Sequence, residues 1–232
     1  MNTWSLAMNN DELVVEHPRN FSARTEVLGG TYFKIAETEY CEYLRIEQIN
    51  DEELSEEEKS ILDGKATQAA IKAIVFSAMC VEAAINNYAG AQLGDSYFNK
   101  HLASLDVISK WVVIPKLVCG KSIDKSCAAF DSLKQLIKAR NSLVHNKSYE
   151  MNISDPVAFM EKISKRKQNF EDDFSNSLRA LYLLSMEMDY VTGQRHNPLI
   201  TFNKKFRPFI EIPELAKPLF NACKDTVIKK YS

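Results

Sequence analysis

The stretch IVFSAMCVEAAIN, residues 74–86, decides the fold class of this chain. It belongs to a segment, 64–88, that is apolar on nearly every face of a helix over residues 71–85. A helix that is apolar all round has to be covered on all sides, so this pattern predicts the central helix of a bundle. Glu82 interrupts the apolar surface, and a carboxylate there must be paired or must face a cavity or an interface. Asn86 follows one turn later on the same face.

The rest of the chain shows helical periodicity on both sides of this segment. Ser55 followed by Glu58 fits a capping box, which predicts a helix start with carboxylates in its first turn. Apolar spacing predicts further helices over about residues 32–49, 99–118, 122–145, 159–191 and 218–231. Pro115 marks a kink or an end in the second of these. Residues 13–15, Leu-Val-Val, are typical of a short strand.

After Gly193 the helical periodicity gives way to short strand-like segments. Residues 199–202 and 209–212 resemble two short strands separated by a basic turn, so we expect a β-hairpin at 199–212. These elements predict a mainly α protein. We expect an N-terminal extension over 1–54, a helical bundle over 55–192, and a C-terminal hairpin and helix over 193–232 packed on the bundle.

The composition narrows the class of protein. The chain has 232 residues, of which 45% are hydrophobic, with 7 glycines and 7 prolines, which suits a helical protein with a sizeable core. A formal net charge of −2 argues against binding nucleic acid through overall positive charge, although a local basic groove stays open. The 5 cysteines form no CxxC pair, so we expect reduced thiols and a cytoplasmic protein. No signal peptide is evident, and Lys72 and Glu82 interrupt the longest apolar stretch, so we expect no membrane span.

The hexapeptide RNSLVH, residues 140–145, concentrates a permanent cation, an amide and an imidazole within about two helical turns. On a helical wheel, the apolar stripe of its helix runs through Phe130, Leu133, Ile137 and Val144. Arg140 and Asn141 fall within or beside that stripe, and His145 falls at its edge. Arg140 therefore needs an anionic partner, and Glu82 on the central helix is the partner we expect.

These three side chains suit metal-independent cleavage of RNA. His145 can both take up and release a proton near neutral pH. Arg140 offers a fork of donors that matches phosphate oxygens and would stabilise the charge that develops on phosphorus. Asn141 can orient a water, a hydroxyl or the imidazole. The reaction benefits from two acid–base groups and one chain supplies one, so we expect a two-fold dimer that brings two copies of this helix together.

Arg140, the polar Asn141, a short spacer and His145 resemble the Rx4–6H motif of HEPN domains. Residues 74–86 also resemble the first core helix of many HEPN-like bacterial proteins, and the resemblance covers roughly residues 60–192. It implies an up-and-down helical bundle that is usually dimeric. Many members of that family are metal-independent ribonucleases of antiphage defence or toxin–antitoxin systems.

The resemblance implies catalytic roles for Arg140 and His145, a supporting role for Asn141, and a structural role beside the site for Glu82, to which we add Asn86. It implies neither a cofactor nor a metal. The implied partners are RNA, a second copy of the chain, and a cognate antitoxin or regulatory protein. The product of such a reaction carries a 2′,3′-cyclic phosphate.

Other interpretations of the same residues stay open. His145 also suits the end of a helix, where it would stabilise the last carbonyl groups, and Arg140 with Glu82 also suits a purely structural ion pair. The chain could then be a non-catalytic HEPN-like bundle that binds a protein partner or a nucleotide, or a structural helical protein. The basic turn could contact phosphate or be a solvated tip, and its candidate residues are Lys204, Lys205 and Arg207.

Overall fold

The computed structural model describes residues 24–50, 52, 54–146, 148, 150 and 155–232, and the backbone of two short strands. These parts of the chain contain seven α-helices: α1 (Gly29–Glu47), α2 (Glu56–Leu93), α3 (Asp95–His101), α4 (Val107–Cys119), α5 (Ala128–Val144), α6 (Pro156–Val191) and α7 (Lys217–Tyr231). Strands β1 (Ser5–Asn9) and β2 (Glu12–Glu16) pair antiparallel, and β2 covers the stretch 13–15 that we expected to be a strand. The prediction of a mainly helical bundle is confirmed.

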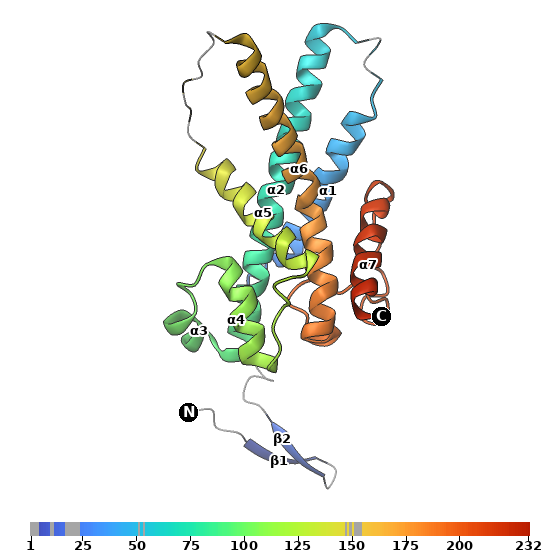
Figure 1. The fold of residues 1–232 in the computed structure, drawn as a ribbon. Coiled ribbons are helices and arrows are strands. Elements are labelled where there is room, and N and C mark those ends of the chain that lie inside the picture. The colour runs from blue at the N-terminus through green and yellow to red at the C-terminus, as the bar shows by residue number, and fades with distance from the viewer. Residues whose placement is uncertain are drawn as a thin grey trace.

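Helix α2 is the centre of the bundle, because α1, α3, α4, α5 and α6 all pack against it (Figure 1). Its buried positions include many small side chains, which let the neighbouring helices approach closely. By length and composition alone α2 could cross a membrane, and 56% of its most apolar window is buried inside the bundle. A central bundle helix has the same composition for a different reason, namely that other helices cover it.

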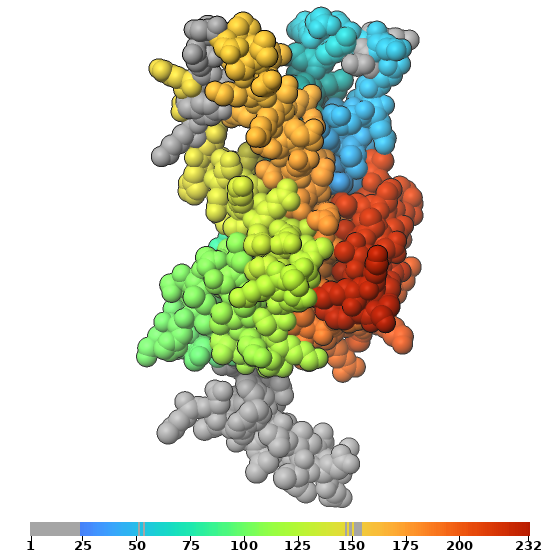
Figure 2. All heavy atoms as spheres, viewed as in Figure 1, coloured from blue at the N-terminus to red at the C-terminus, as the bar shows by residue number. Residues whose placement is uncertain are grey.

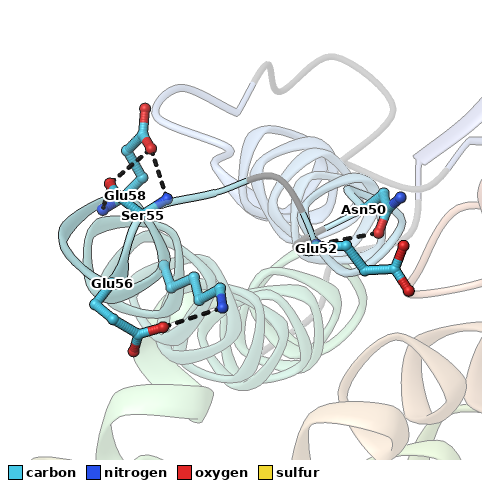
Figure 3. A network of polar contacts seen from close by, with 6 residues as sticks. Asn50, Glu52, Ser55, Glu56 and Glu58 are labelled. Carbon is cyan, nitrogen blue, oxygen red and sulfur yellow. Dashed lines mark hydrogen bonds and ion pairs between the residues drawn. The ribbon is translucent and has the colours of Figure 1, made fainter.

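The start of α2 is fixed by the capping box that the sequence predicts (Figure 3). The backbone N–H of Glu58 donates to Ser55 Oγ at 3.3 Å, and the backbone N–H of Ser55 donates to Glu58 Oε2 at 2.9 Å. Glu56 in the same turn pairs with Lys59 at 3.1 Å. These contacts satisfy amide groups that the first helical turn leaves without intrahelical acceptors.

The single helix that we expected over 99–118 is two helices, α3 and α4. The break occurs at Asp106, whose side chain accepts a hydrogen bond from the backbone N–H of Ser109 at 3.0 Å and so starts α4. Pro115 neither ends nor breaks α4, which continues to Cys119 and stops at Gly120, where φ is +75°. Glycine reaches this left-handed conformation without strain, so it is a natural helix end.

Helix α5 also begins later than we expected, at residue 128 rather than 122. The reason is a turn at Asp124, whose Oδ1 accepts from the backbone N–H of Ser126 at 2.9 Å and from Ser126 Oγ at 2.7 Å. An Asp side chain that bonds to the backbone two residues later competes with helix formation.

The β-hairpin that we expected over 199–212 is wrong, because this segment forms turns and irregular chain. Polar groups of this segment form hydrogen bonds with side chains of α6 instead of with a neighbouring strand. Ser185 Oγ donates to the carbonyl of Ile200, and Thr201 Oγ1 donates to Asp189 Oδ2 at 3.0 Å. Leu199 and Thr201 are buried by this contact, so the segment lies along α6 as a strap.

Helix α1 lies within the segment 1–54 that we expected as an extension, and it packs along α2 and α6. Phe33, Ala36 and Tyr40 enter the core. Glu37 is also buried, with 4% of its side chain exposed, and its carboxylate accepts from Tyr182 Oη at 3.0 Å and Lys34 Nζ at 2.9 Å. Residues 1–4, 10–11 and 17–23 lie outside the described part of the chain.

The two ends of the bundle differ in packing. At the upper end in Figure 1, the first turns of α2 and α6 diverge, and Figure 2 shows the same two arms standing apart. The first buried residue of α2 is Ala66 and that of α6 is Phe174. We call the part of the bundle before these residues, together with the end of α5, the open end. Below it the four helices α1, α2, α5 and α6 enclose the core, and α7 covers α6 (Figure 1).

Candidate functional site

Arg140 on α5 and Glu82 on α2 form the ion pair that we expected between these two helices. Arg140 Nη2 donates to Glu82 Oε2 at 3.2 Å, with 24% of the arginine side chain and 40% of the glutamate side chain exposed. Arg140 Nε is buried and has no hydrogen-bond partner among the described residues. Glu82 is thus the one described residue that pairs with this guanidinium, through Nη2.

Asn141 and His145 lie outside the packed core, on the last turns of α5, and both are exposed. His145 is the residue after the last helical position, and its backbone N–H donates to the carbonyl of Asn141 at 3.0 Å. Its imidazole makes no hydrogen bond or ion pair with any described residue, so the side chain is available to a ligand. Arg140, Asn141 and His145 thus follow one another along the exposed end of one helix.

Our helical-wheel placement of this segment is partly wrong. Val144 was expected in the buried stripe and is 56% exposed, and Asn141, expected within or beside that stripe, is exposed as well. The last buried residue of α5 is Ala139. Beyond it, Leu143 still packs against the core as a partly buried side chain, whereas the next residue, Val144, does not.

Asn86, which we placed beside Glu82, does not bond to Arg140. Its Oδ1 is buried without a hydrogen-bond partner among the described residues, and the residue lines a cavity of about 310 Å³. Arg24 and Asp95 lie on the same cavity and pair with each other at 3.0 Å. Asn86 thus lies one helical turn from Glu82 on α2 and lines this cavity.

The basic turn is also separate from Arg140. Its backbone is fixed by Asn203, whose Oδ1 accepts from the backbone N–H of Lys205 at 2.9 Å and whose carbonyl accepts from that of Arg207 at 3.0 Å. Asn203 in turn donates to Gln194 at 2.7 Å, just after the C-terminal end of α6. The helix that carries Arg140, α5, ends at Val144 and precedes the N-terminal end of α6 in the chain (Figure 1). Lys204, Lys205 and Arg207 therefore do not join the arginine and histidine in one site.

Two buried carboxylates, Glu37 and Glu187, and the half-buried Asp189 were missed by the sequence analysis. Glu37 lies on α1, and Glu187 and Asp189 lie near the end of α6. Glu187 has 2% of its side chain exposed, accepts from Tyr231 Oη at 2.8 Å, and pairs with Lys230. An available signal was the acidic residue inside the strongly apolar run of α6, since such a residue needs a buried partner.

Among the residues that the structure describes, no group of three or more His, Cys, Asp or Glu side chains is placed to hold a metal ion. The candidate site thus consists of one cation held by one carboxylate, with an exposed amide and an exposed imidazole. Such a set can bind an anionic group and exchange one proton with it.

Comparison of the chain with protein-family models, curated proteins and solved structures finds no match. A proposal for the function of this protein therefore has to be argued from the residues around Arg140.

Proposed function

We propose that this protein is a metal-independent endoribonuclease of the HEPN type, which acts as a dimer in the cytoplasm as a toxin or antiphage effector. The observation that supports this proposal is the geometry of Arg140. Glu82 holds its guanidinium between the core and the surface, Asn141 is exposed in the last turn of α5, and His145 is exposed just after the end of that helix. An arginine held by a carboxylate and an exposed imidazole that follows it in the chain supply the two kinds of group that phosphate-ester cleavage needs.

In the reaction, His145 of one subunit accepts the proton of a ribose 2′-hydroxyl as the 2′-oxygen attacks the adjacent phosphorus. The bond from phosphorus to the 5′-oxygen breaks, and that oxygen takes a proton from the imidazolium of the second subunit. Arg140 binds the non-bridging oxygens and stabilises the charge that they gain in the transition state. The products are a 2′,3′-cyclic phosphate and a 5′-hydroxyl.

The open end offers a surface for the second subunit. Val144 is 56% exposed next to His145, and Val157 and Met160 on α6 are 70% and 58% exposed. Covering this apolar surface with its symmetric copy would remove it from water and bring two copies of the arginine and histidine together. A cognate antitoxin or regulatory protein would act by covering the same surface.

The test is cleavage of a mixed-sequence single-stranded RNA by the purified protein in the presence of a chelator. We expect cleavage that leaves cyclic phosphate ends and that falls by at least about 100-fold in the His145→Ala variant. His101→Ala is the matched control, because His101 is also an exposed histidine at the end of a helix, α3. It should cleave as the wild type does.

The same pair of variants gives a second readout in cells. Expression of the wild-type protein should slow the growth of a bacterial host, and His145→Ala should relieve this effect while His101→Ala should not. A folded dimer that cleaves no RNA would overturn the proposal in favour of a non-catalytic bundle that binds a protein partner or a nucleotide. In that case the Arg140–Glu82 pair is structural.

A further inference from the structure

A cavity of about 690 Å³ lies at the C-terminal end of α6, far along the chain from the arginine site. Its walls come from the last turns of α6, from the short helix Gln194–His196, from Phe206 on the basic turn, and from α7. Volumes of this order are typical of sites that bind small organic ligands. α6 belongs to the bundle, and the other walls come from the C-terminal segment after residue 192.

The apolar lining of the cavity includes both buried and exposed side chains. Met186 and Val227 are buried, whereas Tyr190, Phe206 and Ile228 are 47%, 42% and 44% exposed. An exposed ring at the mouth of a cavity presents a flat face on which a second ring can stack.

The two exposed rings are held in place by their neighbours. Tyr190 stacks on Tyr231 with 3.9 Å between ring centroids and 4° between the ring planes. Phe206 packs against the guanidinium of Arg195, whose Cζ lies 5.8 Å from the ring centroid. A ring that is already ordered loses little conformational freedom when a ligand binds.

The polar part of the cavity is basic. Arg195, His196 and Lys224 line it, and Asp189 is its only carboxylate among the described lining residues. Both carboxylate oxygens of Asp189 are occupied, by Asn197 Nδ2 at 2.6 Å and Thr201 Oγ1 at 3.0 Å. Burial raises the pKa of this carboxyl above its usual value. Asp189 thus fixes the segment that contains Asn197 and Thr201 on α6. The basic side chains of the lining are the groups that would contact a ligand.

We propose that this cavity binds a nucleoside monophosphate, with the base against Phe206 and Tyr190 and the phosphate between Arg195 and Lys224. A flat apolar surface beside a fork of charged donors matches a planar base joined to an anionic group. This site is distinct from the proposed ribonuclease site, and its binding does not depend on Arg140 or His145.

The test is isothermal titration calorimetry of the full-length protein with adenosine monophosphate and uridine monophosphate. We expect saturable binding with one site per chain, and binding at least about tenfold weaker for adenosine and for inorganic phosphate, because each carries only one part of the recognised group. The His145→Ala variant should bind as the wild type does. A failure of RNA cleavage and a failure of this site are therefore distinguishable.

Two sets of variants test the phosphate-binding part and the base-binding part of the site separately. The double change Arg195→Gln and Lys224→Gln should weaken binding at least about tenfold, and Phe206→Leu should weaken it about threefold. The matched control is Lys162→Gln with Lys165→Gln, which removes the same charge from exposed positions on α6 near the open end. The control should bind as the wild type does.

Three results would overturn the proposal: no binding of either nucleotide up to about 1 mM by folded protein, equal binding by the double variant and the wild type, or an equal loss in the control. A single-stranded RNA that binds through Arg195 and Lys224 when neither nucleotide binds would also overturn it, in favour of an RNA contact. Circular dichroism of each variant establishes that it is folded.

Discussion

Arg140 on α5 donates from Nη2 to Glu82 Oε2 on α2 at 3.2 Å, and this ion pair joins residues that are 58 positions apart in the chain. The pair lies between the core and solvent, so it is neither a surface pair nor a fully buried one. Its contribution to stability should be correspondingly modest, whatever its part in cleavage.

We expect a double-mutant cycle between Arg140→Ala and Glu82→Ala to give a coupling energy of about 0.5–1 kcal/mol, since solvent reaches both side chains and screens their attraction. Urea unfolding of the wild type, both single variants and the double variant measures it. A coupling energy near zero would contradict this prediction and would show that the pair contributes nothing to stability.

Tyr182→Phe should destabilise the protein by about 1–3 kcal/mol, because it removes one donor from the buried carboxylate of Glu37. Lys34 then remains as the donor to that carboxylate. Urea unfolding measures the change. Tyr97→Phe is the control, since Tyr97 is 45% exposed, and it should stay within about 0.5 kcal/mol of the wild type.

The turn before α5 should make stability depend on pH. Hydrogen bonds from Ser126, together with Lys230, lower the pKa of Asp124 from 3.8 to about 2. A carboxyl whose pKa is lowered by folding stabilises the protein fully above its unfolded pKa and loses that effect as the pH falls from 3.8 toward about 2. Asp124→Asn should therefore lower Tm at about pH 6, and the difference from the wild type should shrink below about pH 4.

Thermal unfolding followed by circular dichroism at several pH values tests this dependence. Asp225→Asn serves as the control, because Asp225 is an exposed aspartate on α7. A difference between wild type and Asp124→Asn that is constant with pH would contradict the assignment.

The cysteines should react with a maleimide in a fixed order. Cys119 is exposed, whereas Cys41, Cys80, Cys127 and Cys223 are buried. Burial raises the pKa of the Cys80 thiol to about 12, so this thiol is both covered and protonated. We expect one fast-reacting thiol in the native protein and 5 after denaturation, counted by mass spectrometry. Cys119→Ser should remove the fast reaction, and fast labelling of Cys80 would contradict the packing of α2.

The parts of the fold that the sequence predicts well are those set by local chemistry or by strong periodicity. The Ser55 capping box marks the start of α2, and the apolar run of residues 71–85 marks its central place. The pairing of Arg140 with Glu82 could also be inferred, because two charged residues on two core helices have few other ways to be satisfied.

The parts that could not be predicted depend on where other elements end. The helical wheel assigns Val144 to the core because it assumes partners along the whole helix, but Val144 is the last residue of α5 and is exposed, although Leu143 before it packs on the core. Residues 199–202 have the composition of a strand, but Ser185 and Asp189 on α6 take their hydrogen bonds. The start of α4 at Asp106 had a local signal, an aspartate three residues before Ser109, which the periodicity of the surrounding residues obscured.

The open end divides the molecule into parts of unequal stability. Ile61, Val157 and Met160 are 51%, 70% and 58% exposed there, so these turns are held mainly by their own backbone hydrogen bonds. Amide hydrogens in the first turns of α2 and α6 should therefore exchange with deuterium well before those of the enclosed core. We expect Arg140, which follows the buried Ala139, to belong to the slowly exchanging part and the exposed His145 to the rapidly exchanging part. In the proposed ribonuclease, the distance between guanidinium and imidazole would then adjust to the bound phosphate, and a second subunit on the open end would fix that distance.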